Sequence, residues 1–557
     1  MRRAVLGALA ALVLAACASI PASGPVTEVE DDRGLGESTA RYTPAGPAPG
    51  ATPDQIVRGF LEAMLAYPVS SQIAAEYLTP DAARDWRPGE STTVYTDARF
   101  GQSAPEGSSR QIRVGWRATA RLDEQGHYRP ADDRVEQQWR LERVEGQWRI
   151  ADPPDGMLVT AEYFEDYFRP FDVYFLDQTG SHVVPDPVFR VVGDQLPTAL
   201  LASIAEGPES ARAASTRSEV PAAERLRGSV PIDTQRVADV EFTIPLRELA
   251  TDERERLAAQ IVWTLQGAPG VGAVRISGSD GVLAIGGEVV QDTAAYASFA
   301  PSSSDGRIAA VVDERLRRLD AQTQRAVPGV SEVGEVAGVA SDQTVVATVA
   351  PDRSTFTVRE EGAPTEVSGT AFLDPVVDRD GTTWAVDASA VRVVADGDVR
   401  TVDTGPLAGV SLTSFAISPD AARYGATAVT PEGGEQLLIG PVLREDDVVE
   451  RLGAPTQVPT PSLSAMRSVT WVTGTRLALL AEGSAGEQVY SVRIDGSDLR
   501  PSLPGLTTLL PRIEPVSLAV GLAEEPRLYV LDVEGRVRLL STRGWERIDA
   551  EAVSAIG

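Results

Sequence analysis

The segment Phe415–Val429 reads FAISPDAARYGATAV, and its pattern decides the fold of the C-terminal half of this chain. Two apolar runs flank Ser418-Pro419-Asp420, where Pro and Asp favour a turn between neighbouring strands. Similar units, with short strands separated by Gly, Pro or Asp turns, recur at intervals of roughly 40–70 residues, close to the period of propeller blades. The other units are Arg307–Asp320, Thr382–Gly397, Val469–Ile494 and Arg527–Leu540.

This recurrence predicts a C-terminal β-propeller over residues 296–557, with about six or seven blades. No convincing helical period follows Tyr296, which agrees with an all-β region. The hairpin AISPDAARYGATAV also resembles the SPDG hairpins of several propeller families. A pair of β-sandwiches is the alternative fold for the same strands.

Residues 52–165 form a separate predicted α+β domain. Apolar residues recur with a helical period between Ile56 and Leu65, and a second short helix is expected at Ile73–Leu78. Strands are then expected at Arg110–Leu122, Val135–Val144 and Gln147–Ala151. Two helices followed by a curved antiparallel sheet ending EGQWRIADPPDG resemble the nuclear transport factor 2-like domains.

Residues 171–290 form a second predicted domain, of the α/β type. The expected elements are a hairpin turning at Asp177–Gly180, a helix at Pro197–Glu206, a strand at Asp239–Thr243, a helix at Asp252–Leu265 and a strand at Ala273–Ser277. The stretches PTALLASIAEGP and LAAQIVWTLQGAPGVGAVRI resemble the GerMN domain of spore germination proteins. That resemblance implies a module of envelope assemblies with no established enzyme chemistry.

The first 16 residues are predicted to be a lipoprotein signal peptide. Arg2-Arg3 precedes the apolar run Ala4–Ala16, which is too short to cross a bilayer because a span needs about 20 residues. Leu14-Ala15-Ala16-Cys17 resembles the lipobox at which a bacterial lipoprotein is lipidated and cleaved. The resemblance implies a diacylglyceryl group on Cys17, whose two acyl chains, such as palmitate, suffice for stable anchoring. An ordinary signal peptide is the alternative.

The residues after Cys17 and the overall composition add three constraints. Residues 17–51 are rich in Pro, Gly and Ser, which predicts a flexible tether. The net charge of −29 and the pI of 4.6 argue against nucleic acid and anionic membrane surfaces as partners. Cys17 is the only cysteine, so no disulfide forms within the chain, and all 51 basic residues are Arg, which suggests a high-GC actinobacterial genome.

Few residues offer catalytic chemistry. The chain has two histidines, and both His127 and His182 are interpreted as surface residues in polar turns rather than as bases ordered by a carboxylate. Neither a zinc-ligand pattern nor a phosphate-binding loop is present, so the sequence predicts no metal, no cofactor and no enzyme activity.

Three further patterns are given structural interpretations. Asp378-Arg379-Asp380-Gly381 is read as a hairpin turn before Trp384, because a calcium loop would need a carboxylate where Ser389 stands. Gly278–Gly281 is likewise read as a turn. Three acidic pairs are placed in solvated, turn-rich segments, and four tryptophans are expected to fill the core of the first domain. These are Asp31-Asp32, Asp132-Asp133, Asp446-Asp447, and Trp86, Trp116, Trp139 and Trp148.

The order of lipobox, two small domains and propeller, with SIPASGPV after the cysteine, resembles the LpqB family of actinobacterial lipoproteins along essentially the full length. The expected fold class is therefore multidomain α+β and β. The resemblance implies an extracytoplasmic, lipid-anchored partner of the sensor histidine kinase MtrB, which modulates two-component signalling in cell-wall homeostasis and division. The alternatives are a propeller that binds or hydrolyses envelope glycans or another ligand, and a structural envelope scaffold.

Overall fold

The structure, a computed structural model, describes residues 42–551 with short gaps. The gaps are 68, 102–103, 107–108, 210–211, 302–307, 314, 320–323, 327–335, 340–344, 361–362, 446, 505–508, 522–526 and 542–543. All described residues belong to one compact unit of the chain. The predicted signal peptide, Cys17, most of the tether and Asp31-Asp32 lie outside the described residues.

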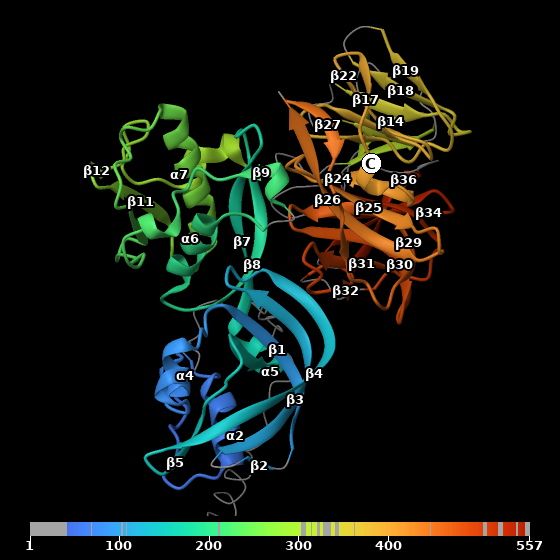
Figure 1. The fold of residues 1–557 in the computed structure, drawn as a ribbon. Helices are drawn as coiled ribbons and strands as arrows, with labels where there is room; N and C mark the ends of the chain where they lie inside the picture. The colour runs from blue at the N-terminus through green and yellow to red at the C-terminus, as the bar shows by residue number, and fades with distance from the viewer. Residues whose placement is uncertain are drawn as a thin grey trace, which may run out of the picture. The chain divides into compact units, whose positions relative to one another are not determined.

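The first domain is a strongly curved sheet with helices packed against it (Figure 1). The strand order is β5-β4-β3-β1-β6 with β2 on β3, and only β1 and β6 run parallel. Helix α2 contacts β3 and β5. The elements are α2 (Pro53–Ala63), α3 (Gln72–Ala75), α4 (Pro80–Asp85), β1 (Ser91–Phe100), β2 (Ala104–Glu106), β3 (Ser109–Asp123), β4 (Tyr128–Val144), β5 (Gln147–Ile150), β6 (Met157–Thr160) and α5 (Ala161–Tyr167).

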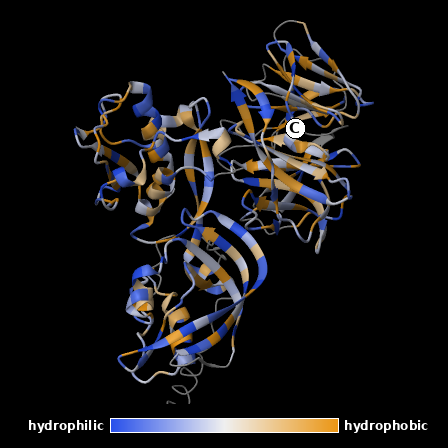
Figure 2. Cartoon of the chain, in the orientation of Figure 1, coloured by the Kyte–Doolittle hydropathy of each residue, from blue (hydrophilic) through white to orange (hydrophobic). Residues whose placement is uncertain are grey.

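Local chemistry explains these elements. Thr52 caps α2 in a capping box with Gln55, and Pro53 occupies the first helical turn, where it costs no hydrogen bond. Every second side chain of β3 from Ile112 to Leu122 is buried, and the residues between them are partly or fully exposed. Figure 2 shows this alternation as bands of hydrophobic and hydrophilic colour along the curved strands.

Two predicted elements of this domain have wrong bounds. The second helix ends at Ala75 instead of Leu78, and Thr79 caps a new helix, α4, because Thr-Pro starts a helix more readily than it ends one. Strand β4 begins at Tyr128, well before the predicted Val135, because Tyr128 pairs with Leu122. The polar residues at its start carry no apolar alternation that would have indicated a strand.

The second domain combines a small antiparallel sheet with a βαβ unit. Helix α7 connects the parallel strands β10 and β11, and the core lies around α6 and α7. Strand β10 is shifted by two residues from the predicted range. The elements are β7 (Phe168–Asp177), β8 (Val183–Val191), α6 (Leu196–Glu206), β9 (Thr216–Arg217), β10 (Val237–Glu241), α7 (Thr251–Gln266), β11 (Ala273–Gly278) and β12 (Gly281–Val282), with 3₁₀ turns at Ala213–Ser215, Ala223–Arg225 and Thr293–Phe299.

The third domain contains six described sheets, which we call blades 1 to 6 in chain order (Figure 1). The strands are β13 (Ile308–Val312), β14 (Arg315–Leu319) and β15 (Gln324–Ala326); β16 (Val336–Val339), β17 (Val346–Val349), β18 (Thr355–Arg359) and β19 (Thr365–Ser368); β20 (Val376–Val377), β21 (Thr383–Val386), β22 (Val391–Ala395) and β23 (Asp398–Thr401); β24 (Ser411–Ile417), β25 (Arg423–Val429), β26 (Glu435–Glu445), β27 (Val448–Leu452) and β28 (Thr456–Val458); β29 (Ser464–Thr473), β30 (Arg476–Gly483), β31 (Gly486–Arg493) and β32 (Arg500–Pro501); β33 (Pro515–Gly521), β34 (Arg527–Asp532), β35 (Arg536–Ser541) and β36 (Gly544–Glu551). Gly405–Leu407 forms a 3₁₀ turn.

The six blades close into a ring. The first strands β13, β16, β20, β24, β29 and β33 contact one another in this order, and β33 contacts β13. Neighbouring blades share apolar cores, and Ile308 and Leu319 of blade 1 are buried with Tyr529 and Val537 of blade 6. Each described blade therefore lies between two neighbouring blades, as in a closed propeller. The propeller prediction is confirmed, and the β-sandwich alternative is wrong.

Candidate functional site on the propeller

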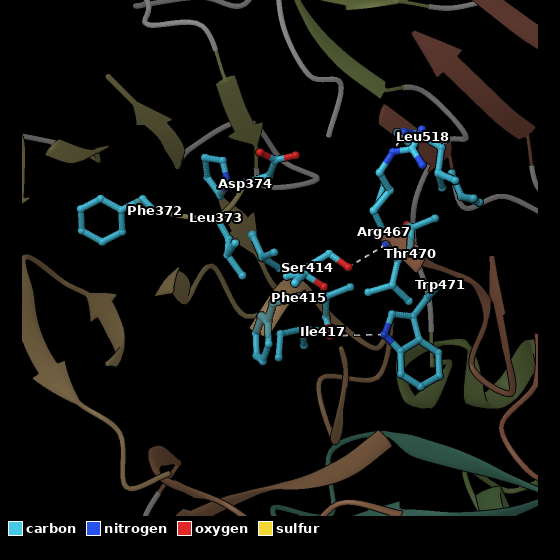
Figure 3. A pocket seen from close by; sticks show the side chains of 18 of the residues that line it. Phe372, Leu373, Asp374, Ser414, Phe415, Ile417, Arg467, Thr470, Trp471 and Leu518 are labelled. Atoms are coloured by element: carbon cyan, nitrogen blue, oxygen red, sulfur yellow. Dashed lines mark hydrogen bonds between the residues drawn. The ribbon is translucent and has the colours of Figure 1, made fainter. Parts of the chain in front are cut away.

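A pocket opens among the first strands of blades 3 to 6. Its volume is about 480 Å³, and β20, β24, β29 and β33 supply most of its walls. Apolar side chains such as Leu373, Phe415 and Leu518 surround a smaller number of polar groups (Figure 3). An apolar lining with a few placed polar groups is typical of binding pockets.

Hydrogen bonds within blade 4 and between blades 4 and 5 fix polar groups of this pocket. The Ser414 hydroxyl lies 2.6 Å from that of Thr427 and accepts a 3.1 Å hydrogen bond from the Val469 amide (Figure 3). The second hydrogen bond drawn in Figure 3 runs from Trp471 Nε1 to the Ala416 carbonyl oxygen, at 3.5 Å. These bonds join blades 4 and 5 and fix the pocket wall.

The charged groups of the pocket form ion pairs at its rim. Arg353 donates to Asp374 at 3.0 Å, and Arg467 donates to Glu487 at 2.5 Å. Asp374 is the one carboxylate among the described lining residues. Hydrolysis of glycosides usually requires two carboxylates flanking the scissile bond. The described lining therefore holds one of the two carboxylates that this hydrolysis usually requires.

The opposite end of the propeller, where first strands end and second strands begin, contacts the second domain. We call this end the docked face. Arg423, the first residue of β25, is 1% exposed. Its guanidinium donates to Asp420 at 2.8 Å, to the Gly474 carbonyl at 2.9 Å and to the Pro185 carbonyl of β8 at 3.0 Å. Gly474 is required here, because a Cβ atom would lie 2.5 Å from the Pro185 ring.

Further polar contacts extend the docked face over blades 4 and 5. The Asp172 carboxylate of β7 accepts from the Thr475 hydroxyl at 3.2 Å and from Arg493 at 2.9 Å. The Gln178 side chain, in the β7–β8 turn, accepts from the Arg444 backbone amide at 2.7 Å. One hairpin of the second domain therefore covers the ends of strands from two blades.

A buried ionic cluster joins the first and second domains. His127 is 4% exposed; its Nδ1 lies 2.9 Å from Asp123 and its Nε2 lies 3.6 Å from Asp186 of β8. Arg212 lies 2.6 Å from the other oxygen of Asp186 and 2.6 Å from Glu209. The prediction of a surface His127 is wrong, because the polar turn that carries it packs against β8.

The two carboxylates control the titration of His127. Burial opposes its protonation, but hydrogen bonds and charges from Asp123 and Asp186 raise the pKa of His127 to about 9. Burial also opposes the ionisation of Asp186, yet Arg212 and His127 hold the pKa of that carboxyl well below its ordinary value. The cluster is therefore charged and internally paired at neutral pH.

His182 lies in a different environment. It is half-buried instead of exposed, and its backbone amide, not its ring, donates to Asp177 at 3.0 Å. Burial and the nearby positive charge of Arg379 lower its pKa. These properties do not suit a general base that a carboxylate must orient and stabilise.

The two predicted turns have the expected backbone. Gly381 donates to the Asp378 carbonyl at 3.1 Å, and the buried Asp378 carboxylate accepts from Trp384 Nε1 at 3.1 Å. Burial, only partly offset by Arg444, raises the pKa of Asp378 to about 6. Gly278 and Gly281 pair across the short β11–β12 hairpin.

The acidic pairs and tryptophans give mixed outcomes. Asp132 and Asp133 lie within β4 and form ion pairs with Arg117 and Arg121, so their predicted turn location is wrong. Asp447 lies in the turn before β27, whereas Asp446 lies outside the described residues. The expected core position is found for three of the four tryptophans, while Trp148 is partly buried against that core and stacks beneath Arg143. The three are Trp86, Trp116 and Trp139.

Metal binding and membrane crossing concern the described residues as a whole. No group of three or more His, Cys, Asp or Glu side chains is placed to hold a metal ion in this part of the chain. No helix between residues 42 and 551 combines the length and apolarity that crossing a membrane requires, the gaps aside.

Comparisons with known proteins match these three domains. The family described as "Lipoprotein LpqB, N-terminal domain" matches residues 46–165, "Sporulation and spore germination" matches 172–282, and "Lipoprotein LpqB beta-propeller domain" matches 314–554. A putative TolB structure from Agrobacterium tumefaciens has a TM-score of 0.31 at 12% identity, over 46% of this chain and 94% of that chain.

Several proteins named Lipoprotein LpqB are similar along most of this chain. The Cutibacterium acnes protein is 27% identical, with 89% of each chain covered, and that of Thermobifida fusca is 26% identical, with 90% of this chain and 91% of its own covered. The Mycobacterium tuberculosis protein is 28% identical over 96% of each chain. The three domains define a multidomain protein whose third domain is a β-propeller. The chain belongs to the LpqB lipoprotein family, as the sequence resemblance predicted.

Sequence reasoning missed the residues that hold the domains together. Asp172, Asp186, Arg212 and Arg423 are ordinary charged residues in the sequence, and no motif distinguishes them from solvated ones. One signal was available for Arg423, because it directly follows the turn of the recognised propeller hairpin. Its partner Pro185 lies far away along the chain, so the contact itself could not be predicted.

Proposed function

We propose that this chain is a lipid-anchored envelope protein that binds the extracytoplasmic part of the sensor kinase MtrB and thereby modulates two-component signalling. Membership of the LpqB family carries the proposal, because the relatives are named as lipoproteins and the family resemblance implies a partner of this kinase. The pocket lining, with one described carboxylate, supports recognition rather than catalysis.

The anchor is the first element of this function. Cys17 is the only cysteine and follows Leu14-Ala15-Ala16 in the lipobox-like segment. A diacylglyceryl group there holds the chain at the membrane that also holds the kinase. A shared surface raises the effective concentration of the two partners, so that a weak interface is sufficient for association.

Two measurements test the function directly. Pull-down of the exported protein from membranes should recover the kinase, and deletion of the protein should change kinase output. Cys17→Ser should abolish membrane attachment and signalling while binding to the isolated kinase ectodomain persists. Absence of association at low salt contradicts the proposal, and unchanged kinase output on deletion would favour a structural scaffold.

The pocket of about 480 Å³ favours a second candidate, the binding of a small envelope ligand such as a glycan. The volume falls within the usual range of ligand sites. Screening of envelope glycan fragments against the purified protein tests this candidate. Binding that is lost in Thr470→Trp, which narrows the pocket, would support it.

A further inference from the structure

The end of the propeller opposite the docked face presents an acidic rim. We call this end the open face; first strands begin here, and second strands turn into third strands. Two exposed glutamates of this face, Glu487 and Glu534, pair with Arg467 and Arg536. Four others form no ion pair with another described residue, and these are Glu432, Glu435, Glu482 and Glu514. Arg512, and Arg325 at the start of β15, are exposed cations at the same end, so unpaired glutamates outnumber unpaired cations among the described residues there.

A groove lies beside this rim between blades 5 and 6. It measures about 650 Å³ and is lined by Ala485–Gln488, Leu510–Glu514 and Asp532–Arg536 without Gly535. Exposed apolar side chains are concentrated here, since Val533 is 59% exposed and Val516, at the neighbouring pocket, is 45% exposed. The Val533 amide donates to the Glu514 carbonyl at 3.0 Å, so an exposed valine and a free glutamate are adjacent.

The docked face is covered by the second domain over blades 4 and 5. Arg423, Thr475 and Arg493 are engaged there by Pro185 and Asp172 of the same chain. In contrast, every described residue that lines the groove or the pocket of the open face belongs to the propeller itself. The open face is therefore the end at which a partner meets apolar side chains and uncompensated carboxylates together.

We infer that the open face is the docking surface for the kinase ectodomain, which presents a segment with an apolar side chain for Val516 and Val533 and an Arg or Lys side chain for Glu514. This inference rests on the proposed function and adds the surface and the chemistry of the contact. Interfaces combine a desolvated apolar centre with a polar rim, and opposite charges speed association. A second copy of this chain fits poorly, because each copy carries a net charge of −29.

The test compares two open-face substitutions with two matched controls in the full lipoprotein. Val533→Asp and Glu514→Arg alter the open face, whereas Val399→Asp and Glu366→Arg make the same changes at exposed positions of outer strands β23 and β19. Affinity for the purified kinase ectodomain is measured in detergent, and a photo-crosslinker is placed at position 533 or 399 in cells. Both open-face variants should weaken binding about tenfold or more, as central contacts do.

The outcomes separate the two claims. Loss of affinity in both open-face variants but in neither control, with crosslinks to the kinase from position 533 only, supports the inference. If the unaltered protein binds the ectodomain but the open-face variants bind equally well, the inference is overturned and the proposed function stands. If the unaltered protein does not bind, the proposed function fails. Crosslinks from position 533 to a second copy of this chain overturn the inference in favour of self-association.

Discussion

The two faces of the propeller use charged residues in opposite ways. On the docked face Arg423 is buried and shares its donors among Asp420, Gly474 and Pro185. On the open face Glu482 and Glu514 remain in solvent without a cationic partner among the described residues. Burial makes a charge dependent on its partners, whereas exposure leaves it available for a new one. The docked end of the propeller therefore contributes to stability, and the open end offers charges for recognition.

Arg423→Met should produce the largest effect of any single change that tests this contrast. The substitution leaves the Asp420 carboxylate buried without its cation, which should lower the free energy of unfolding by about 3–5 kcal/mol. Urea denaturation followed by tryptophan fluorescence measures the loss. The double variant Arg423→Met with Asp420→Asn should recover much of it. A loss below about 1 kcal/mol would show that the docked face does not depend on this ion pair.

The His127 cluster extends the comparison to the first two domains and makes stability depend on pH. Its pKa of about 9 in the folded state exceeds the ordinary value of 6.5, so its contribution is fully present below pH 6.5 and disappears as the pH rises through about 9. The contribution at stake is on the order of 3 kcal/mol. Denaturation between these pH values measures it, and His127→Gln should flatten the profile in this range. An unchanged profile in the variant would assign the pH dependence to other groups.

Salt should weaken electrostatic interactions at the open face much more than the buried contacts of the docked face. The acidic rim is exposed, so raising the salt concentration from about 0.05 M to about 0.5 M should slow association with the kinase ectodomain roughly tenfold. The buried contacts of Arg423 are screened far less, so the unfolding midpoint should change little. Stopped-flow association and thermal melts at both salt concentrations measure the two effects. Equal association rates at both concentrations would contradict an electrostatic contribution of the rim.

The smallest effect is expected for an ion pair at the open face. Arg353 and Asp374 lie 3.0 Å apart with side chains that are 40% and 47% exposed, so Arg353→Met should cost less than about 1 kcal/mol. The same denaturation assay serves as the measurement. A loss as large as that of Arg423→Met would remove the distinction between the two faces.

The sequence by itself determined the elements whose cause is local. The Pro-Asp turn at Pro419-Asp420, the capped helical period after Thr52 and the alternation along β3 each follow from neighbouring residues, so their positions were predicted within a few residues. Where local signals were mixed, bounds were wrong, as at Thr79-Pro80 and the polar start of β4.

Only the tertiary structure decided the environment of the charged residues. His127 was predicted to lie at the surface because its neighbours in the sequence are polar. In the structure it is buried, and its Nε2 lies 3.6 Å from Asp186 of another domain. No sequence pattern distinguishes the environments of Arg423 and Glu514. Arg423 is buried against Pro185, whereas Glu514 is exposed at a groove. The physical reason is that desolvation and pairing depend on segments that are distant along the chain. The order of residues therefore encodes the blades, whereas their packing against the second domain decides which face is closed.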